Sequence, residues 1–364
     1  MEEASASEIP IDTPPLMRVH LVRIDPDTHY LLWTFHHAIL DGWSVSILFD
    51  DLLRFYEQAR SGAIDYVPEG PGYRAHVVAT RRRDLAAAEA FWRRELAGAR
   101  EAGWLSPERT TGAFPEGRRG AVEATVGVDH ASALIDLARE AHVSIGTVLH
   151  GAWSLFLRRH AGTRHVLFGS TMSGRSPDVP ESESIAGLFS VTQPLLVEVP
   201  DEAQLGSWLR NLQDRYAELR EYAHAPLSSV QTWAGTPAGE LMFDNVLVIE
   251  NYPRRSHRPD RTSELVLDDI RFIDPSHYPL TLTAEMGDSL SLRAAYDGHR
   301  FDAAAARAIL SDLEILLEML AGRCECTLAE IIEGHRAAVG AKLESLARGT
   351  VATARRRIAG SAEE

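Results

Sequence analysis

Cysteine is almost absent from this chain of 364 residues, and that scarcity excludes the small folds that depend on disulfide bridges. The two cysteines, Cys324 and Cys326, are separated by one residue, which suits neither a disulfide framework nor a four-ligand zinc site. We therefore expect a reducing, cytoplasmic compartment and a protein that holds no metal.

Basic residues are also fewer than acidic ones. Lysine and arginine total 37 against 52 aspartate and glutamate residues, so the formal charge is -15, and no long basic run offers the footprint that a nucleic-acid backbone requires. No apolar run reaches the length of a membrane span, and the opening residues MEEASASEIPIDTPP lack the apolar core of a secretory signal. We expect a soluble protein with neither a nucleic-acid nor a membrane partner.

The composition that remains, 45% hydrophobic and 24% charged, is that of an ordinary globular protein of roughly two domains. Two β-rich runs joined by DPDTH predict a β-hairpin over residues 17–37. After it, Ser44 can cap a helix with one apolar face. That face comprises Ile47, Leu48, Leu52, Phe55 and Tyr56.

A cluster of glycine, proline and charged residues predicts a boundary near residue 115, after a helix over 83–97. Beyond it, strand and helix patterns alternate, which indicates a mixed α/β class with two lobes. We expect a first lobe over 1–114, a second over 115–335 and a helical or linker tail over 336–364. The expected strands are 121–128, 165–170, 241–251, 278–286 and 290–296, and the expected helices are 129–142, 144–160, 203–222 and 302–320.

The stretch FHHAILDGWS, residues 35–44, places two histidines at the end of the second hairpin strand. Successive side chains of a strand point to opposite faces, so His36 and His37 are expected to point apart and not to bind one metal ion. A neutral imidazole at His37 could accept a proton from an amine or alcohol that attacks a carbonyl. Asp41 could hold the loop by pairing with a cation, and Gly42 could let the backbone turn.

A structural interpretation stays open for the same residues. Both histidines could be satisfied core groups, and Asp-Gly could be a plain turn. The chain has no G-x-S-x-G elbow, no Walker-type phosphate loop and no paired C-x-x-C motif. Serine hydrolases, P-loop enzymes and structural zinc modules therefore have no support, and acyl transfer by direct attack remains.

With these residues in view, FHHAILDGWS resembles the active-site motif of the condensation domains of nonribosomal peptide synthetases, a family similar in fold to chloramphenicol acetyltransferase. Further stretches resemble the signatures of that family in the expected order and cover the chain from about Ile9 to about Leu320. They are PPLMRVHLVRI, AFWRRELAG, VLFGSTMSGR, IAGLFSVTQPLL, FDNVLVIEN and YPLTLTAEMGDSLSLRAAYDGHRFD.

The resemblance implies two acetyltransferase-like lobes in a V, with a tunnel between them that two carrier proteins approach. Each carrier would bring its substrate as a thioester on a phosphopantetheine arm, and the chain would need no cofactor of its own. The resemblance also implies that the first part of the N-terminal lobe is missing, so that a second polypeptide or a second copy could complete it.

The resemblance further implies roles for individual residues. His37 would be the catalytic or substrate-orienting residue, Asp41 would pair with Arg175, and Gly42 would face the reacting centre. His36 would be a packing or hydrogen-bonding residue. The residues expected near the tunnel are Trp43, Ser44, Ser173, Ser190, Thr192, Gln193 and Asn251.

Three functions remain in competition. The first is a condensation enzyme that forms an amide, or less readily an ester, between a carrier-bound donor and an acceptor. The second is an acyltransferase of the same fold that uses soluble acyl-CoA. The third is a non-catalytic platform that recruits carriers or other enzymes, and the intact histidine motif favours the enzymes over it.

Overall fold

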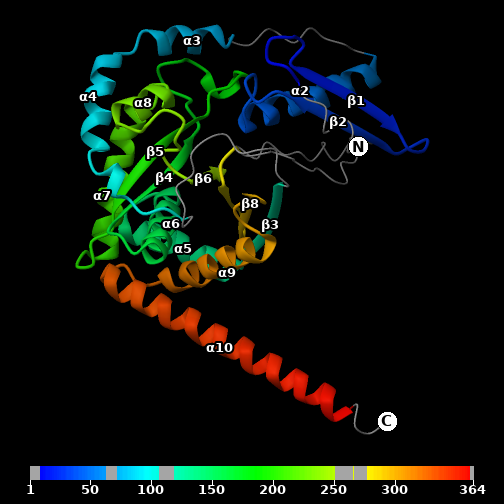
Figure 1. Cartoon of the computed structure of the whole chain (residues 1–364). Coiled ribbons are helices and arrows are strands. Elements are labelled where there is room, and N and C mark those ends of the chain that lie inside the picture. Colours follow the sequence, from blue (N-terminus) through cyan, green and yellow to red (C-terminus); the bar gives the residue numbers. More distant parts are fainter. Residues whose placement is uncertain (1–8, 63–71, 106–118, 251–264, 266–276, 361–364) are drawn as a thin grey trace. The chain divides into compact units, whose positions relative to one another are not determined.

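The computed structural model describes residues 9–62, 72–105, 119–250, 265 and 277–360. The chain divides into two compact units that do not follow a single cut in the sequence. Among the described residues, the first unit contains the segment up to Asp84, the segment Ser173–Val191 and Leu265, and the second contains the remainder. Each is described by itself (Figure 1).

The boundary predicted near residue 115 differs from this division. Helix α4 (Leu85–Glu95) already belongs to the second unit, while Ser173–Val191 returns to the first. The physical reason is packing: Phe91 and Trp92 on α4 are buried, and the Trp92 indole donates to the Tyr222 carbonyl 3.1 Å away. A composition shift along the chain does not report such distant contacts.

The first unit begins with the expected hairpin. Strands β1 (Met17–Arg23) and β2 (His29–Phe35) pair antiparallel from Met17 opposite Phe35 to Arg23 opposite His29. Its other elements are α2 (Gly42–Ser61), α3 (Arg74–Arg81) and the 3₁₀ turn η2 (Ser182–Ser184). The turn that joins the strands is closed by Asp25, whose carboxylate accepts from the Asp27 and Thr28 amides.

Helix α2 starts earlier than the sequence indicates. Its N-cap is Asp41, and the Asp41 carboxylate accepts the Ser44 amide at 2.8 Å, so the assignment of Ser44 as the cap is wrong. Gly42 is the first helical residue, not a left-handed turn. The expected apolar face is only partly covered, since Leu52 and Phe55 are 43% and 45% exposed.

The second unit is built on a six-stranded mixed sheet in the order β3-β8-β7-β6-β4-β5. Strand β6 pairs parallel with β4 and β7, whereas β8 pairs antiparallel with β7 and β3. The strands are β3 (Arg119–Val126), β4 (His165–Met172), β5 (Val191–Glu198), β6 (Asn245–Glu250), β7 (Leu280–Met286) and β8 (Leu290–Asp297). The mixed α/β class is confirmed.

Helices cover this sheet (Figure 1). The 3₁₀ turn η1 (Ala99–Glu101) follows α4, and the helices are α5 (Val128–Ala141), α6 (Ile145–Ala161), α7 (Leu205–Glu221), α8 (Leu227–Trp233), α9 (Ala303–Leu320) and α10 (Leu328–Gly360). Helices α6 and α9 contact the strands, and α5 and α7 pack on α6.

Helix α6 shows how the sequence sets this packing. Ser144 caps it by accepting the Thr147 amide, and Gly162 ends it in the left-handed conformation. Trp153 and Phe156 between them are buried and stacked with ring centroids 4.8 Å apart, and the Trp153 indole donates to Asn245 Oδ1 at 2.9 Å.

The tail predicted over 336–364 is, as far as Gly360, part of α10, whose first turns pack on α9. The cysteines are both free, with Cys324 buried. No helix of the described part of the chain is both long and apolar enough to cross a membrane.

Candidate active site

The histidine pair lies in a turn directly after β2, not on the strand. The His36 amide donates to the Leu16 carbonyl at 2.9 Å, and the His36 carbonyl accepts the Ile39 amide at 3.1 Å. The placement of the two histidines on the strand is wrong because β2 ends at Phe35, so the argument from alternating strand faces does not apply to their side chains. The two histidines nevertheless differ in their surroundings.

His36 holds the turn. Its Nδ1 accepts the Ala38 amide at 3.0 Å, so the ring carries its proton on Nε2 when neutral. His37, the next residue, is exposed, and neither of its ring nitrogens has a hydrogen-bond partner among the described residues. Of the two imidazoles, His37 is the one with both nitrogens open to a substrate.

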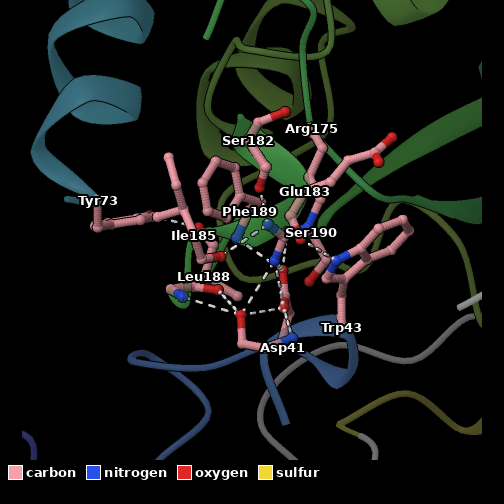
Figure 2. A network of polar contacts seen from close by, with 12 residues as sticks. Asp41, Trp43, Tyr73, Arg175, Ser182, Glu183, Ile185, Leu188, Phe189 and Ser190 are labelled. Atoms are coloured by element: carbon pink, nitrogen blue, oxygen red, sulfur yellow. Dashed lines mark hydrogen bonds and ion pairs between the residues drawn. The ribbon is translucent and has the colours of Figure 1, made fainter. Parts of the chain in front are cut away.

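The loop that carries His37 ends at Asp41, which is 3% exposed and accepts several hydrogen bonds (Figure 2). Oδ1 accepts the Ser44 amide at 2.8 Å and Arg175 Nη2 at 3.1 Å. Oδ2 accepts the amides of Phe189 and Ser190 at 3.0 and 3.2 Å. The carboxylate thus joins the start of α2 to a segment almost 150 residues away.

Arg175 is the cation with which Asp41 was expected to pair, and the two side chains do form an ion pair. The two side chains are only 3% and 4% exposed, so the ion pair is buried. Nη1 of Arg175 donates to the carbonyls of Ser182 and Ile185, which fixes the backbone around η2. A buried charge pair of this kind requires such additional hydrogen bonds to offset its desolvation.

Aromatic rings enclose the guanidinium. The Arg175 Cζ atom lies 4.2 Å from the centroid of the Phe189 ring and 5.1 Å from that of Trp43. Trp43 is itself held by a 2.8 Å hydrogen bond from its indole to the Glu183 carbonyl. Both rings present an electron-rich face to the cation, which adds attraction and excludes water.

Ser44 lies at the centre of the same network and is fully buried. Its hydroxyl accepts the Gly187 amide at 2.9 Å and Arg175 Nη2 at 3.1 Å. It lies 2.6 Å from both Asp41 Oδ1 and the Gly187 carbonyl, and because it has one proton it donates to one of them at a time. Ser44 is therefore part of the anchor and is not exposed to a tunnel.

Tyr73 and two glycines, Gly174 and Gly187, pack against the segment around Phe189. The Tyr73 hydroxyl donates to the Leu188 carbonyl, and its ring meets Phe189 edge-on at 5.3 Å. A Cβ at Gly187 would lie 2.1 Å from the Tyr73 ring. Gly174 has φ +62°, and a Cβ there would lie 1.8 Å from the Phe189 carbonyl oxygen, so glycine is required.

We name this set the anchor: Asp41, Ser44, Tyr73, Arg175, Gly187, Phe189 and Ser190. Burial raises the pKa of Tyr73, and the charge of Asp41 raises it further, so the hydroxyl stays protonated and donates. Burial likewise lowers the pKa of His76, whose ring contacts Phe189 at 4.3 Å. The anchor can hold a loop rigidly, and it presents no reactive group of its own.

The other residues expected near the tunnel separate into three groups. Ser173 is exposed in the first unit, and Ser190 is fixed through its amide. Thr192 and Gln193 belong to the second unit. Asn251 lies outside the described residues.

Gln193 has a structural role. It is 1% exposed, and its amide donates to the carbonyls of Ala223 and Ala225 at 2.9 and 2.7 Å, between α7 and α8. A side chain so buried does not line an open tunnel, which corrects that expectation. Thr192 bonds Thr171 through their hydroxyls at 2.9 Å, on neighbouring strands.

Three members of the anchor, Tyr73, Gly187 and Phe189, were not singled out from the sequence. Gly187 and Phe189 lie inside IAGLFSVTQPLL, a stretch used for the resemblance, but nothing local indicates which of its residues meet Asp41. The one available signal for Tyr73 was its place at the start of YRAHVVATRRR, after a run rich in glycine and proline.

Comparisons with known proteins agree with one another. A family model described as "Condensation domain" matches residues 1–333. A linear gramicidin synthase of Brevibacillus parabrevis is 35% identical over 308 residues, which are 84% of this chain and 6% of that protein. The chain thus spans a small fraction of the length of this relative.

Two solved structures show the same fold. The first condensation domain of the calcium-dependent antibiotic synthetase, in complex with a substrate analogue, matches with a TM-score of 0.69 at 15% identity, over 90% of this chain and 72% of that one. The X-domain from teicoplanin biosynthesis, in complex with OxyB, also matches with a TM-score of 0.69, at 18% identity, over 87% of this chain and 72% of that one.

Proposed function

Because this chain belongs to the condensation-domain family, we propose that it is a condensation-type acyltransferase that joins a thioester donor to an amine acceptor. The amine nitrogen attacks the thioester carbonyl carbon, and the C–N bond forms as the C–S bond breaks. The sulfur leaves as the thiol of the donor arm and takes up a proton, while the nitrogen loses one. An ester would form in the same way from a hydroxyl acceptor.

We assign to His37 one of two roles: it accepts the proton of the attacking amine, or it orients that amine. Its free ring nitrogens allow it to accept the proton of the attacking amine, or to hold that amine by a hydrogen bond so that attack is productive. His36 is excluded from this role because its Nδ1 is engaged by the Ala38 amide. Gly42 contributes no side chain at the start of α2, close to His37 in the chain.

The anchor is the single observation that carries the proposal. A general base contributes only when its position is held within a fraction of an ångström, and the loop 36–41 is held at both ends. At one end the His36 amide bonds Leu16, and at the other the Asp41 carboxylate bonds Arg175 and three amides. A plain turn needs no buried ion pair whose guanidinium packs against Trp43 and Phe189.

The substrates and partners follow from the family in the same proposal. Carrier proteins would deliver donor and acceptor on phosphopantetheine arms, in the cytoplasm, and the chain would supply no cofactor. The expectation that a second polypeptide or a second copy completes the N-terminal lobe stays a prediction. Val19 and Leu21 on β1 and Leu31 on β2 are 58%, 69% and 42% exposed, which is compatible with a covering partner.

The test is an intact-mass assay of acyl transfer between loaded carrier proteins, with the wild-type chain and its His37→Ala variant. We expect the variant to lose at least about 100-fold in rate, the contribution of a positioned acid or base. His36→Ala removes the side chain that holds the same turn and shows how much of the loss comes from loosening the turn alone, and circular dichroism checks that each variant is folded. A His37→Ala variant that keeps the full rate would remove His37 from the mechanism.

A donor competition separates carrier-bound from soluble substrates. We expect the carrier-bound thioester to be preferred over the same acyl group on coenzyme A. A preference for the CoA ester would instead assign the chain to the acyl-CoA-dependent acyltransferases of this fold.

One observation favours the platform as a second candidate. The X-domain of teicoplanin biosynthesis has the same fold and was solved in complex with another protein, OxyB. Stoichiometric capture of a carrier, without turnover and without an effect of His37→Ala, would favour the platform over the enzyme. Intact His37, Asp41 and Arg175 favour the enzyme.

A further inference from the structure

An open groove of about 600 Å³ lies on the first unit, and none of the residues assigned to chemistry lines it. One wall is helix α3, from which Arg74, Val78 and Arg82 line it, and the other is the segment 178–180. These three residues follow one another at intervals of four along the helix, so they share one face. Two cations with an apolar side chain between them therefore border the groove.

This wall is locally basic, although the whole chain is acidic. The formal charge of the whole protein is -15, yet residues 72–84 contain four arginines and one aspartate. Arg83 is committed to Asp178, at 2.7 Å, and to Ser176. Arg74, Arg81 and Arg82 are exposed and form no ion pair with any described residue. Their charge is available to a partner.

The floor of the groove is built on a packed apolar cluster. Ala79 and Val179 line it, and Val179 is 3% exposed in a cluster with Ile185 and Phe189, against which Tyr73 also packs. Phe189 is a member of the anchor. A surface built on a packed core needs no ordering when a partner binds, which favours affinity from few contacts.

We propose that this groove is a docking surface for a carrier protein, which presents one helix to α3. The inference rests on the proposed function and names the surface at which its partner binds. The helix carries acidic residues about two turns apart, opposite Arg74 and Arg82, and an apolar residue between them that rests on Val78. Because α3 rises 1.5 Å per residue, these arginines are separated by about 12 Å along the axis, the span of about two turns of the partner helix.

Charge and size favour a small acidic protein over other polyanions. An extended polyanion such as a nucleic acid would meet the repulsion of a chain with a net charge of -15 beyond the groove. A single acidic helix would meet mainly Arg74 and Arg82, since Asp178 on the other wall already pairs with Arg83. Opposite charges at such a rim speed encounter and set the register, while Val78, 37% exposed, supplies the apolar contact.

The experiment measures binding of holo peptidyl carrier proteins, labelled with fluorescein on the phosphopantetheine, by fluorescence anisotropy. The variant Arg74→Glu/Arg82→Glu should weaken binding by about tenfold or more, and the loss should shrink as salt is raised. Arg307→Glu/Arg336→Glu is the charge-matched control, since both arginines are exposed on helices of the second unit. It should change binding by less than about threefold, because exposed charges outside the contact are screened.

Arg74→Ser/Arg82→Ser provides a second variant, should the glutamates disturb α3, and it should weaken binding by a smaller factor. Melting temperatures check that all variants are folded. Binding that is unchanged in a folded charge-reversed variant overturns the proposal. So does the absence of binding to the wild-type chain across the carrier panel.

A carrier-free substrate separates this proposal from the proposed function. Turnover of an aminoacyl N-acetylcysteamine thioester should be the same in the wild type and in both groove variants, because that substrate carries no docking helix. Carrier binding that depends on the groove, with no turnover of any substrate, would support the groove and refute the enzyme. If the charge-reversed variant turns over carrier-bound substrate at the wild-type rate, the enzyme is supported and the groove is refuted.

Discussion

Replacement of Asp41 by alanine perturbs the anchor at its most connected residue. The variant loses the 3.1 Å contact with Arg175 and leaves that guanidinium buried, because the Arg175 side chain is only 3% exposed. It also removes the acceptor of three amides, those of Ser44, Phe189 and Ser190. Each of these donors then lacks a partner where water has little access.

The magnitude follows from the burial of the pair. Removal of one partner of a buried ion pair costs about 3 to 5 kcal/mol, because the other charge is left uncompensated. The loss of the helix cap contributes about 1 kcal/mol, and the terms overlap because they share one carboxylate. We expect a total of about 4 kcal/mol, or roughly a thousandfold in the opening equilibrium at 1.4 kcal/mol per factor of ten.

Hydrogen exchange followed by mass spectrometry measures this opening directly. Peptides that contain Ser44 and Phe189–Ser190 should exchange about a thousand times faster in Asp41→Ala, since their amides lose the Asp41 acceptor. Asp302→Ala is the matched control. Asp302 also caps a helix, accepting the Ala305 amide at 2.7 Å, but it is exposed and forms no ion pair among the described residues. It should cost only about 1 kcal/mol.

Two further variants probe the same carboxylate. Asp41→Asn should be nearly as damaging as alanine, because every group that points at the carboxylate is a donor and the amide NH₂ would face one of them. Asp41→Ala/Arg175→Met should be more stable than Asp41→Ala alone, since it removes the stranded charge. Exchange that is unchanged at Phe189 and Ser190, or additive effects of the two substitutions, would refute the account.

Three other predictions have defined outcomes. Gly174→Ala should lower the melting temperature more than Gly187→Ala, because its Cβ meets a backbone oxygen at 1.8 Å whereas the other meets the movable ring of Tyr73; the reverse order would contradict this. Gln193→Ala should cost about 1 to 3 kcal/mol in urea unfolding by leaving two carbonyls unpaired, without raising KM; a raised KM in a stable variant would restore its tunnel role. Burial lowers the pKa of His150 to about 4, below the ordinary 6.5 of the unfolded chain, so stability is complete above pH 6.5 and is lost as the pH falls toward 4. The expected loss in the free energy of unfolding is about 3 kcal/mol, and it should be absent in His150→Gln. Urea unfolding at several pH values measures it. If the free energy of unfolding falls equally in both proteins between pH 6.5 and 4, His150 does not titrate there.

Local pattern was sufficient for much of the fold. The hairpin, the helix after Asp41 and most of the strands and helices from β3 to α9 were predicted within a few residues, because each depends on a period of two or 3.6 along the chain. Helices α3 and α8 were not predicted, since each is eight residues or fewer and lacks a long apolar stripe.

The residues of the candidate site were largely predicted from the sequence, but only part of their geometry was. Asp41 and Arg175, 134 residues apart, do meet, but the pairing came from a resemblance between motifs and not from any local signal. The cap at Ser44 and the placement of His36 and His37 on the strand were wrong. Both depended on where a strand ends and a helix begins, which is decided by tertiary hydrogen bonds to Leu16 and Arg175.

By itself the sequence determined the class of the protein, its acidic character and the presence of a histidine whose chemistry suits acyl transfer. Only the tertiary structure decided that Ser44 is a buried member of the anchor, that Gln193 supports α7 and α8, and that Tyr73 and Gly187 fit each other. The physical reason is chain separation. Periodicity reports which face of an element is apolar, whereas the partner of a buried polar group is set by packing between segments that lie from 30 to almost 150 residues apart in the chain.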